Sequence, residues 1–279
     1  MLIEYNPFGT NTQSLYVYFE TDSAVKVSYT IHVKEDDIAD FSRNVYQDEE
    51  YQKEHEFQVI GLIPDTENTI TFYITNEDSS TDTKEIVYEM GSLYGEEAVQ
   101  LDTDVKQSAD KLEDGLYVVL GNDSPSMDFM YYYDNNGVLR GEVPLLGYRS
   151  HRLIFDENSM YYSISEKKMA QVNRLGQVTK VYDLGNYKLH HDYVFDENGN
   201  LYIADFCANA IVKVTKDGYV SRLAQSPDCD GLDGGLDQPG EPIIYDGKIV
   251  ASCFDLVTGP GKVNTAHEMP ATLAEVDIS

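Results

Sequence analysis

The sequence predicts an all-β protein in which an N-terminal β-sandwich precedes a β-propeller of about four blades. Two observations predict this class. Short strands of alternating side-chain character fill the first 92 residues, and a pattern recurs about every 40 residues from Gly115 onward. A hydrophobic content of 42%, with 22 Tyr and 10 Phe among 279 residues, is enough for a buried core and excludes a largely disordered chain.

The predicted sandwich covers residues 1–92. Residues 61–72 contain a Leu-x-Pro turn of the kind that leads into a late strand of a fibronectin-type sandwich, although Asn68 stands where those domains often have Tyr. Residues 93–113 are polar with few apolar anchors, which predicts a linker containing at most one helical turn. The expected strands are rich in β-branched and aromatic residues and lie at 14–19, 24–33, 56–60, 69–75 and 85–90.

The predicted propeller covers residues 114–279. Phe155-Asp156-Glu157-Asn158 recurs 40 residues later as Phe195-Asp196-Glu197-Asn198, and a Tyr-containing strand follows each copy. A period near 40 that holds four short strands is typical of a propeller blade.

Glycine turns support the same period. Gly137, Gly176 and Gly218 lie between expected strands and are separated by 39 and 42 residues. Tyr245-Asp246-Gly247 matches a further copy of the repeat, displaced by an insertion at residues 227–240. The count from Gly115 is therefore about four blades.

Charge limits the partners that we expect. The chain has 49 acidic and 20 basic residues, for a formal net charge of -29, so nucleic acid and anionic membrane surfaces are disfavoured partners. No apolar run approaches the length of a transmembrane helix. Met1–Tyr5 lacks the basic and apolar regions of a signal peptide, which predicts a cytoplasmic location by default and a periplasmic or extracellular one if the chain is processed.

The repeat register brings polar residues to equivalent places. His151 lies four residues before Phe155, His191 four before Phe195, and Glu241 four before Tyr245. Equivalent positions of successive blades face the same end of a propeller, so we expect these side chains to converge there, as acid–base chemistry requires. The alternative is that each one caps a strand or binds a neighbouring loop.

Neighbouring residues extend this candidate site. Asp192 can orient His191 or His190 through a ring N–H and so fix its tautomer. Arg149 and Arg152 flank His151 and can stabilise oxyanion charge. The alternatives are a carboxylate in a strand-end turn for Asp192 and surface ion pairs for the arginines.

An Asp-rich segment at residues 228–237 offers oxygen ligands for Ca²⁺, although it lacks the Glu at position twelve of an EF-hand. We expect a solvated turn there, and Ca²⁺ binding is the alternative. Cys207, Cys229 and Cys253 lack metal-binding or redox spacing, and we expect them to be buried or half-buried bystanders. We expect no cofactor.

Seven segments together resemble the bacterial arylsulfate sulfotransferases, over about residues 4–202. These segments lie at 6–10, 15–21, 55–62, 114–117, 133–140, 147–152 and 190–195. The resemblance implies an N-terminal sandwich and a six-bladed propeller. It also implies transfer of a sulfuryl group from one phenol to another through a sulfated histidine, without a nucleotide sulfate donor.

The sequence departs from that family in its length and in its tail. Members of that family are about twice as long, and the blades that carry the sulfated histidine would lie beyond the matched residues. By the resemblance, His190, His191, Asp192 and, less directly, His151 then correspond to non-nucleophilic contacts with sulfate or phenol, and His267 is a candidate for the missing nucleophile. The resemblance implies a phenol and a phenolic sulfate as small-molecule partners.

The tail, residues 240–277, instead resembles a closing blade of gluconolactonase-like propellers. Two further functions therefore stay open: a truncated, inactive propeller that acts as a binding module, and a metal-dependent hydrolase that uses Glu241, Asp192 and the Asp-rich segment.

A propeller of four blades either closes through the strand at residues 272–278 or leaves an edge through which a homo-oligomer can form.

Overall fold

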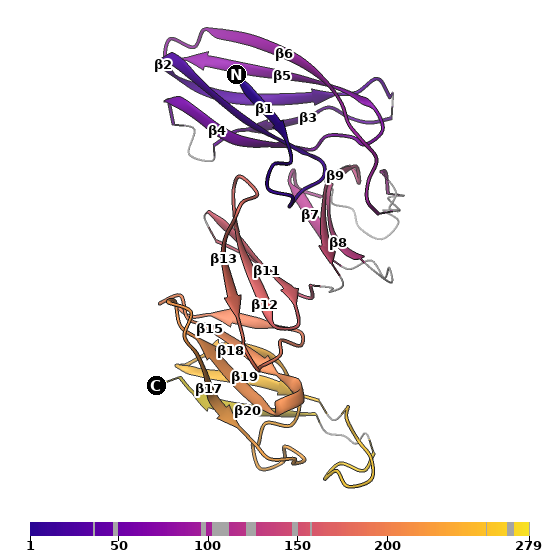
Figure 1. Ribbon diagram of the computed structural model, residues 1–279, viewed down its shortest axis with the longest axis vertical. Helices are drawn as coiled ribbons and strands as arrows, with labels where there is room; N and C mark the ends of the chain where they lie inside the picture. The colour runs from indigo at the N-terminus through magenta and orange to yellow at the C-terminus, as the bar shows by residue number, and fades with distance from the viewer. Residues whose placement is uncertain are drawn as a thin grey trace. The chain divides into compact units, whose positions relative to one another are not determined.

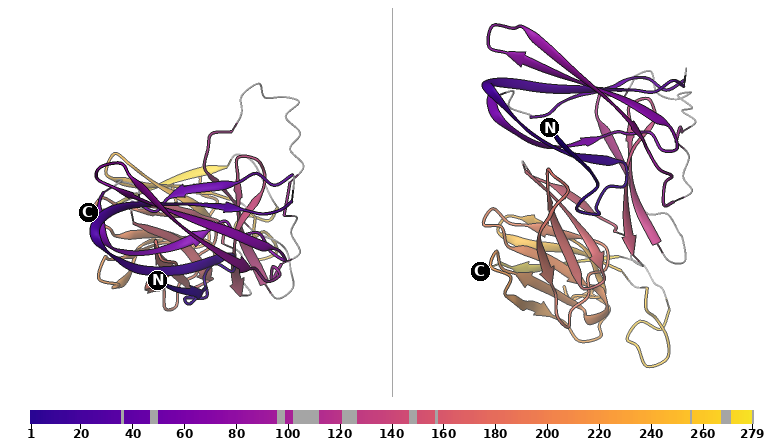
Figure 2. Two further views of the ribbon diagram at one scale, coloured as in Figure 1. Left: turned by 90° about the horizontal axis from the view of Figure 1, so that it is seen from above. Right: turned by 45° about the horizontal axis from the view of Figure 1, so that its top comes forward.

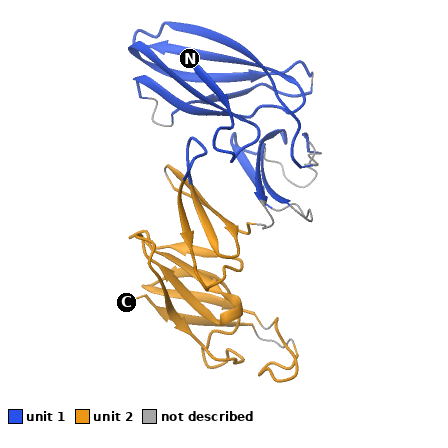
Figure 3. Ribbon diagram, in the orientation of Figure 1, with its two compact units in different colours: residues 1–146, 172–178 blue, residues 147–171, 179–279 orange. Residues whose placement is uncertain are grey.

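The computed structural model describes residues 1–35, 37–46, 50–95, 99–101, 112–120, 127–146, 150–156, 158–254, 256–266 and 271–278. The predicted all-β class is confirmed, because the described residues form β-strands and one short 3-10 helix, η1 (Phe206–Ala208) (Figure 1). None of these residues belongs to a helix long and apolar enough to cross a membrane. The chain divides into two compact units: residues 1–146 with 172–178, and residues 147–171 with 179–279 (Figure 3).

The sandwich is built around one long strand. We expected two strands at 14–19 and 24–33, but β2 runs without interruption and bends where its register shifts between Glu20 and Val25. Its first half pairs with β1 and β4, and its second half pairs with β3 and β5, so β2 belongs to both layers. The strands are β1 (Leu2–Tyr5), β2 (Ser14–His32), β3 (Phe41–Asn44), β4 (Gln52–Ile60), β5 (Glu67–Asn76) and β6 (Thr81–Glu89).

Alternating residues of these strands form the sandwich core. Leu15 and Val17 from the first half of β2 pack with Ile31 from its second half, with Val59 from β4 and with Phe72 from β5. A strand repeats every two residues, so this alternation buries one face of each layer.

Asn68, whose identity departs from the fibronectin pattern, is buried and closes the turn before β5. Its Oδ1 accepts from the Ile63 N–H at 2.8 Å, and its Nδ2 donates to the carbonyls of Ile63 at 2.9 Å and Thr66 at 3.1 Å. An amide side chain therefore fixes the turn at the position where related sandwiches often have a tyrosine.

Four antiparallel sheets follow in chain order, as the repeat predicts. The second and third sheets have four strands, and the described residues give the first and last three each. The sheets are β7 (Leu116–Leu120), β8 (Met127–Asp134) and β9 (Leu139–Leu146); β10 (Leu153–Phe155), β11 (Ser159–Ser165), β12 (Lys168–Asn173) and β13 (Val178–Asp183); β14 (Tyr193–Phe195), β15 (Leu201–Asp205), β16 (Ala210–Val214) and β17 (Val220–Gln225); and β18 (Pro239–Tyr245), β19 (Lys248–Cys253) and β20 (Thr272–Asp277).

The glycine turns have the backbone that the repeat requires. Gly137, Gly176 and Gly218 have φ angles of 76°, 80° and 89°, a left-handed region that glycine enters without steric cost. The Asn173 side chain accepts from the N–H groups of Leu175 and Gln177, both at 3.0 Å, so a side-chain hydrogen bond supports its turn.

Neighbouring sheets of the second unit pack face to face (Figure 2). Met169 of β12 and Tyr182 of β13 share a buried cluster with Tyr193 of β14 and Leu201 of β15. A second cluster joins β15 and β16 to the last sheet, through residues such as Tyr202 and Ile249. This packing holds the starts of β10 and β14 in fixed positions, and the candidate histidines precede those strands.

Candidate active site

Three imidazoles gather where two successive sheets begin. His151 lies two residues before β10, and His191 lies two residues before β14. Their ring centroids are 4.8 Å apart. The ring centroid of His190 is 3.8 Å from that of His191, and the two rings are nearly perpendicular. The sequence register thus corresponds to a real cluster, defined from here on as the histidine cluster of His151, His190 and His191.

His190 is held in its neutral form. Its ring stacks on Phe206 of η1, with centroids 4.2 Å apart, and its buried Nδ1 has no hydrogen-bond partner among the described residues. Burial lowers the pKa of His190 to about 4, and the neighbouring His191 and His151 add to the fall. An uncharged imidazole keeps a nitrogen lone pair, which a nucleophile or base needs.

A hydrogen bond joins His151 to the segment that carries the other two histidines. The Nδ1 of His151 lies 3.0 Å from the carbonyl oxygen of His190. A carbonyl oxygen only accepts, so Nδ1 of His151 carries the proton in this contact. In its neutral form, His151 therefore has its lone pair on Nε2.

Asp192 does not bond to a histidine ring, the role that the sequence suggested for it, in any contact of the described residues. Its carboxylate instead accepts from the Arg152 guanidinium at 2.9 Å and from the Tyr193 N–H at 2.6 Å. Burial raises the pKa of Asp192, while the Tyr193 N–H and Arg152 oppose the rise and Glu241 adds to it. The pair is asymmetric, because the Asp192 side chain is 12% exposed and that of Arg152 is 46% exposed.

Glu241 occupies a different local position from the two histidines. It lies inside β18, at a register shift between Pro239 and Pro242, whereas the histidines precede their strands. Its side chain is exposed, and its charge acts on Asp192. Glu241 therefore lies on the side of the site that holds the Asp192 carboxylate.

Two predicted residues cannot be placed. Arg149 and His267 lie outside the described residues. The roles of Arg149 as an anion contact and of His267 as a candidate nucleophile stay predictions.

Sequence reasoning missed the residues that hold the cluster. Tyr193 donates to the Arg152 carbonyl oxygen, and the buried Ser150 donates to the same oxygen. Phe206 provides the face on which His190 stacks. Tyr193 directly follows Asp192, and this adjacency is the signal that could have drawn attention to it.

The Asp-rich segment uses its carboxylates within the protein. Asp228 accepts from the Val263 N–H at 2.9 Å, Asp230 from the Leu232 N–H at 3.1 Å, and Asp237 from the Asn264 amide at 2.8 Å. Among the residues that the structure describes, no group of three or more His, Cys, Asp or Glu could hold a metal ion. Calcium binding here stays an untested alternative.

The three cysteines are free thiols, and they differ in burial. Cys253 is buried and Cys229 is half-buried, as expected. Cys207 is exposed, which corrects our expectation, because it follows the buried Phe206 in the turn of η1 and its side chain faces away from the core.

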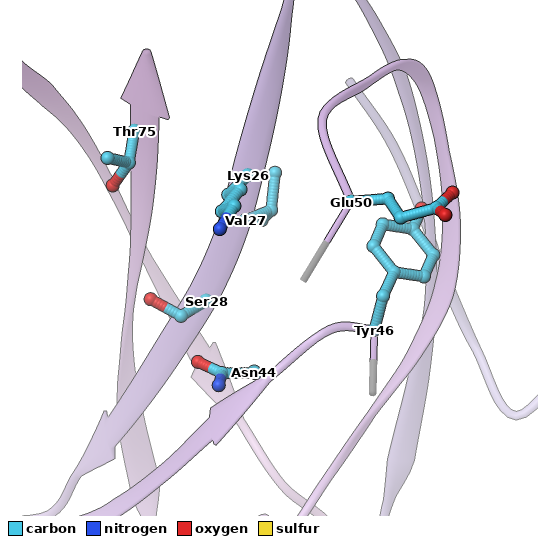
Figure 4. Close-up of a pocket in the computed structure, with 7 residues that line it drawn as sticks. All are labelled: Lys26, Val27, Ser28, Asn44, Tyr46, Glu50 and Thr75. Carbon is cyan, nitrogen blue, oxygen red and sulfur yellow. The ribbon is translucent and has the colours of Figure 1, made fainter. Parts of the chain in front are cut away.

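The sandwich has a hollow of its own. Lys26, Ser28 and Thr75 line one side of it, and Tyr46 and Glu50 line the other (Figure 4). It contains no histidine, so its chemistry differs from that of the histidine cluster.

Comparison with known protein families decides the relationship. Residues 2–91 match the arylsulfotransferase Ig-like domain, and residues 101–222 match the arylsulfotransferase domain itself. The chain belongs to the arylsulfotransferase family. The match to the second domain includes the whole histidine cluster and ends before Glu241 and His267. None of the curated proteins compared with this sequence matches it.

Three solved structures show distant likenesses to this arylsulfotransferase-like chain. Virginiamycin B lyase from Staphylococcus aureus is 11% identical, with 85% of this chain and 81% of that chain covered and a TM-score of 0.33. A protein of unknown function from Bacteroides caccae is 12% identical, with 82% and 83% covered and a TM-score of 0.37. Dipeptidyl peptidase 4 from Porphyromonas gingivalis is 15% identical, with 86% and 32% covered and a TM-score of 0.35. Similarities this weak carry no argument about activity.

Proposed function

We propose that this arylsulfotransferase-like protein transfers a sulfuryl group from a phenolic sulfate ester to a phenol through a histidine, without a nucleotide sulfate donor. One observation carries the proposal: three imidazoles from two neighbouring sheets are in contact, and burial keeps one of them neutral. Neutral imidazole is a nitrogen nucleophile, and a second imidazole beside it supplies the proton transfer that the leaving phenolate needs.

The first half-reaction forms a sulfated histidine. A ring nitrogen of the histidine cluster attacks the sulfur of the aryl sulfate, and the bond from sulfur to the phenolic oxygen breaks. A neighbouring imidazolium gives its proton to the departing phenolate. The Arg152 guanidinium, which is half-exposed beside Asp192, stabilises charge on the sulfuryl oxygens.

The second half-reaction returns the enzyme to its starting state. The acceptor phenol loses its proton to the imidazole that gave one up earlier, and its oxygen attacks the sulfur. The nitrogen–sulfur bond breaks, and its electrons return to the histidine ring as a lone pair. Each histidine regains its original protonation, so no other reactant is consumed.

Turnover of 4-nitrophenyl sulfate tests this proposal. With phenol as acceptor and no nucleotide added, we expect continuous release of 4-nitrophenol and formation of phenyl sulfate. With the acceptor omitted, release should stop after about one equivalent per chain, because the sulfated histidine has no phenol to react with. Absence of release in both arms would contradict the proposal and favour the binding module.

A further inference from the structure

Tyr193 reaches from one sheet into the next. Its ring is fully buried at the start of β14, and its hydroxyl lies 2.5 Å from the Arg152 carbonyl oxygen and 3.3 Å from the Tyr161 carbonyl oxygen. A phenol has one proton to donate. The shorter distance therefore indicates that the Tyr193 hydroxyl donates its proton to the carbonyl oxygen of Arg152, in the segment that carries His151.

The same carbonyl is held from a second side. Ser150, which is 1% exposed, donates its hydroxyl to the Arg152 oxygen at 3.0 Å. That hydroxyl is also 3.0 Å from the Ser163 hydroxyl of β11. The Ser150 side chain and the Arg152 carbonyl, one on each side of His151, are thus bonded to buried groups, although the His151 side chain itself is exposed.

Tyr193 also follows directly after the other two histidines. Residues 190–193 contribute the His190 carbonyl that accepts from His151, the Asp192 carboxylate that accepts from Arg152, and the Tyr193 hydroxyl. Three hydrogen bonds therefore join residues 150–152 to residues 190–193. Of these, the Tyr193 bond is the one made by a fully buried side chain.

We propose that Tyr193 is a positioning residue, whose hydroxyl holds His151 against His191 and keeps the His151 proton on Nδ1. Its catalytic consequence rests on the proposed sulfuryl transfer. Without the hydroxyl, the Arg152 carbonyl keeps only the Ser150 bond, and the segment can turn. His151 then loses its contact with the His190 carbonyl and with it the fixed tautomer.

A matched pair of variants separates positioning from stability. Tyr193→Phe removes the hydroxyl, and Tyr202→Phe removes a hydroxyl that donates to Asp196 at 3.1 Å from an equally buried ring in β15. Both variants lose one hydrogen bond in the same sheet, so a similar small fall in Tm is expected. Asp196 lies beyond the opposite end of β14 from the histidine cluster, so Tyr202→Phe should leave the cluster unchanged.

The His151 ring proton gives a test that needs no activity. In ¹⁵N-histidine NMR spectra, a signal that His151→Ala removes identifies the His151 Nδ1–H. We expect Tyr193→Phe to abolish this signal or expose it to rapid exchange with water, and Tyr202→Phe to keep it. A signal that survives in Tyr193→Phe would overturn the proposal.

Kinetics give the second test. We expect Tyr193→Phe to lower kcat for sulfuryl transfer by about 10-fold to 100-fold with little change in KM, since small displacements of reacting groups have effects of this size. In a His151→Ala background, Tyr193→Phe should have no further effect. An undiminished loss in that background would overturn the proposal. A wild-type protein without transfer would contradict the proposed function alone, because the NMR signal tests the position of His151 separately.

Discussion

Two histidines in different parts of the chain share an aromatic stacking partner, a buried Nδ1 and a lowered pKa. His55 in the sandwich stacks on Phe19 with centroids 4.8 Å apart, and His190 in the blade region stacks on Phe206 at 4.2 Å. Each has a buried Nδ1 without a hydrogen-bond partner among the described residues. Burial lowers the pKa of both. A neutral, buried imidazole is therefore not by itself evidence of a catalytic site.

The difference lies in what surrounds each ring. His55 is fully buried, and its ring neighbours are the aromatic residues Phe19 and Tyr46. His190 is half-buried beside two more imidazoles, with the Arg152–Asp192 ion pair next to them. Proton transfer needs a partner that can take or give the proton, and the blade region provides one. We therefore place the proposed chemistry at the histidine cluster and propose a packing role for His55.

The largest expected effect comes from His191, the ring in contact with both other imidazoles. His191→Ala should lower sulfuryl transfer by about 100-fold or more, the usual scale for a positioned acid or base. The rate of 4-nitrophenol release with phenol as acceptor measures this loss.

His32→Ala is the control. His32 is an exposed sandwich histidine that pairs with Asp40 at 2.7 Å, so its loss should leave the transfer rate unchanged. Equal losses in the two variants would erase the distinction between the two regions.

The next largest expected effect is a loss of stability in the sandwich, with no change in sulfuryl transfer. Asn68→Ala removes three buried hydrogen bonds in the turn before β5 and leaves the Ile63 main-chain groups unsatisfied. We expect a loss of about 2 kcal/mol in the free energy of unfolding, measured by urea denaturation.

Asn76→Ala serves as a comparison, because Asn76 bonds to Ser80 in an exposed turn. Its cost should stay within about 0.5 kcal/mol. Transfer per folded molecule should be the same in both variants. A selective loss of transfer in Asn68→Ala would show that the sandwich contributes to the chemistry.

A smaller effect is expected at Arg152. Arg152→Gln removes the guanidinium that pairs with Asp192 and, in the proposed mechanism, contacts the sulfuryl oxygens. KM for 4-nitrophenyl sulfate should rise roughly tenfold, as expected for a lost hydrogen bond to a charged group.

Arg222→Gln makes the same charge change at an exposed position in β17 and should leave KM unchanged. If both substitutions raise KM equally, the effect reflects the overall charge of the protein and not a contact with substrate.

The smallest expected effect is on how the free energy of unfolding depends on pH, and it compares the two buried histidines directly. His55 and His190 stay neutral in the folded protein at pH values where the unfolded chain binds protons, because their pKa values are lowered. Stability should therefore fall as the pH drops from about 6.5 toward 4. His55→Phe, which keeps a ring against Phe19, should reduce the slope by roughly one proton. Urea unfolding at several pH values measures the slope, and an unchanged slope would contradict a neutral His55.

Much of the fold could be predicted because it is repeated. Phe155 and Phe195, which begin the two Phe-Asp-Glu-Asn copies, end β10 and β14, and the glycine turns have the expected positive φ angles. Strand continuity was harder to predict. Residues 20–23 of β2 are polar, as in a turn, yet a register shift absorbs the bend and the strand continues.

The candidate site was only partly predictable. The spacing between His151 and His191 gave their proximity, since one blade period separates them. Pairing between Arg152 and Asp192, and stacking of His190 on Phe206, depend on how neighbouring sheets pack. Long-range contacts of this kind leave no local pattern in a single sequence. The position of Glu241 could not be predicted either, because a register shift in β18 places it within the strand, whereas the two histidines precede their strands.

The most direct test of the central claim is the site at which a sulfuryl group is held. Wild-type protein incubated with 4-nitrophenyl sulfate and no acceptor should gain the mass of one SO₃ per chain, and added phenol should remove it. Peptide mapping should place the group on His151, His190 or His191. An SO₃ group on His267 or on a sandwich residue, or no mass gain at all, would contradict the assignment of the chemistry to the histidine cluster.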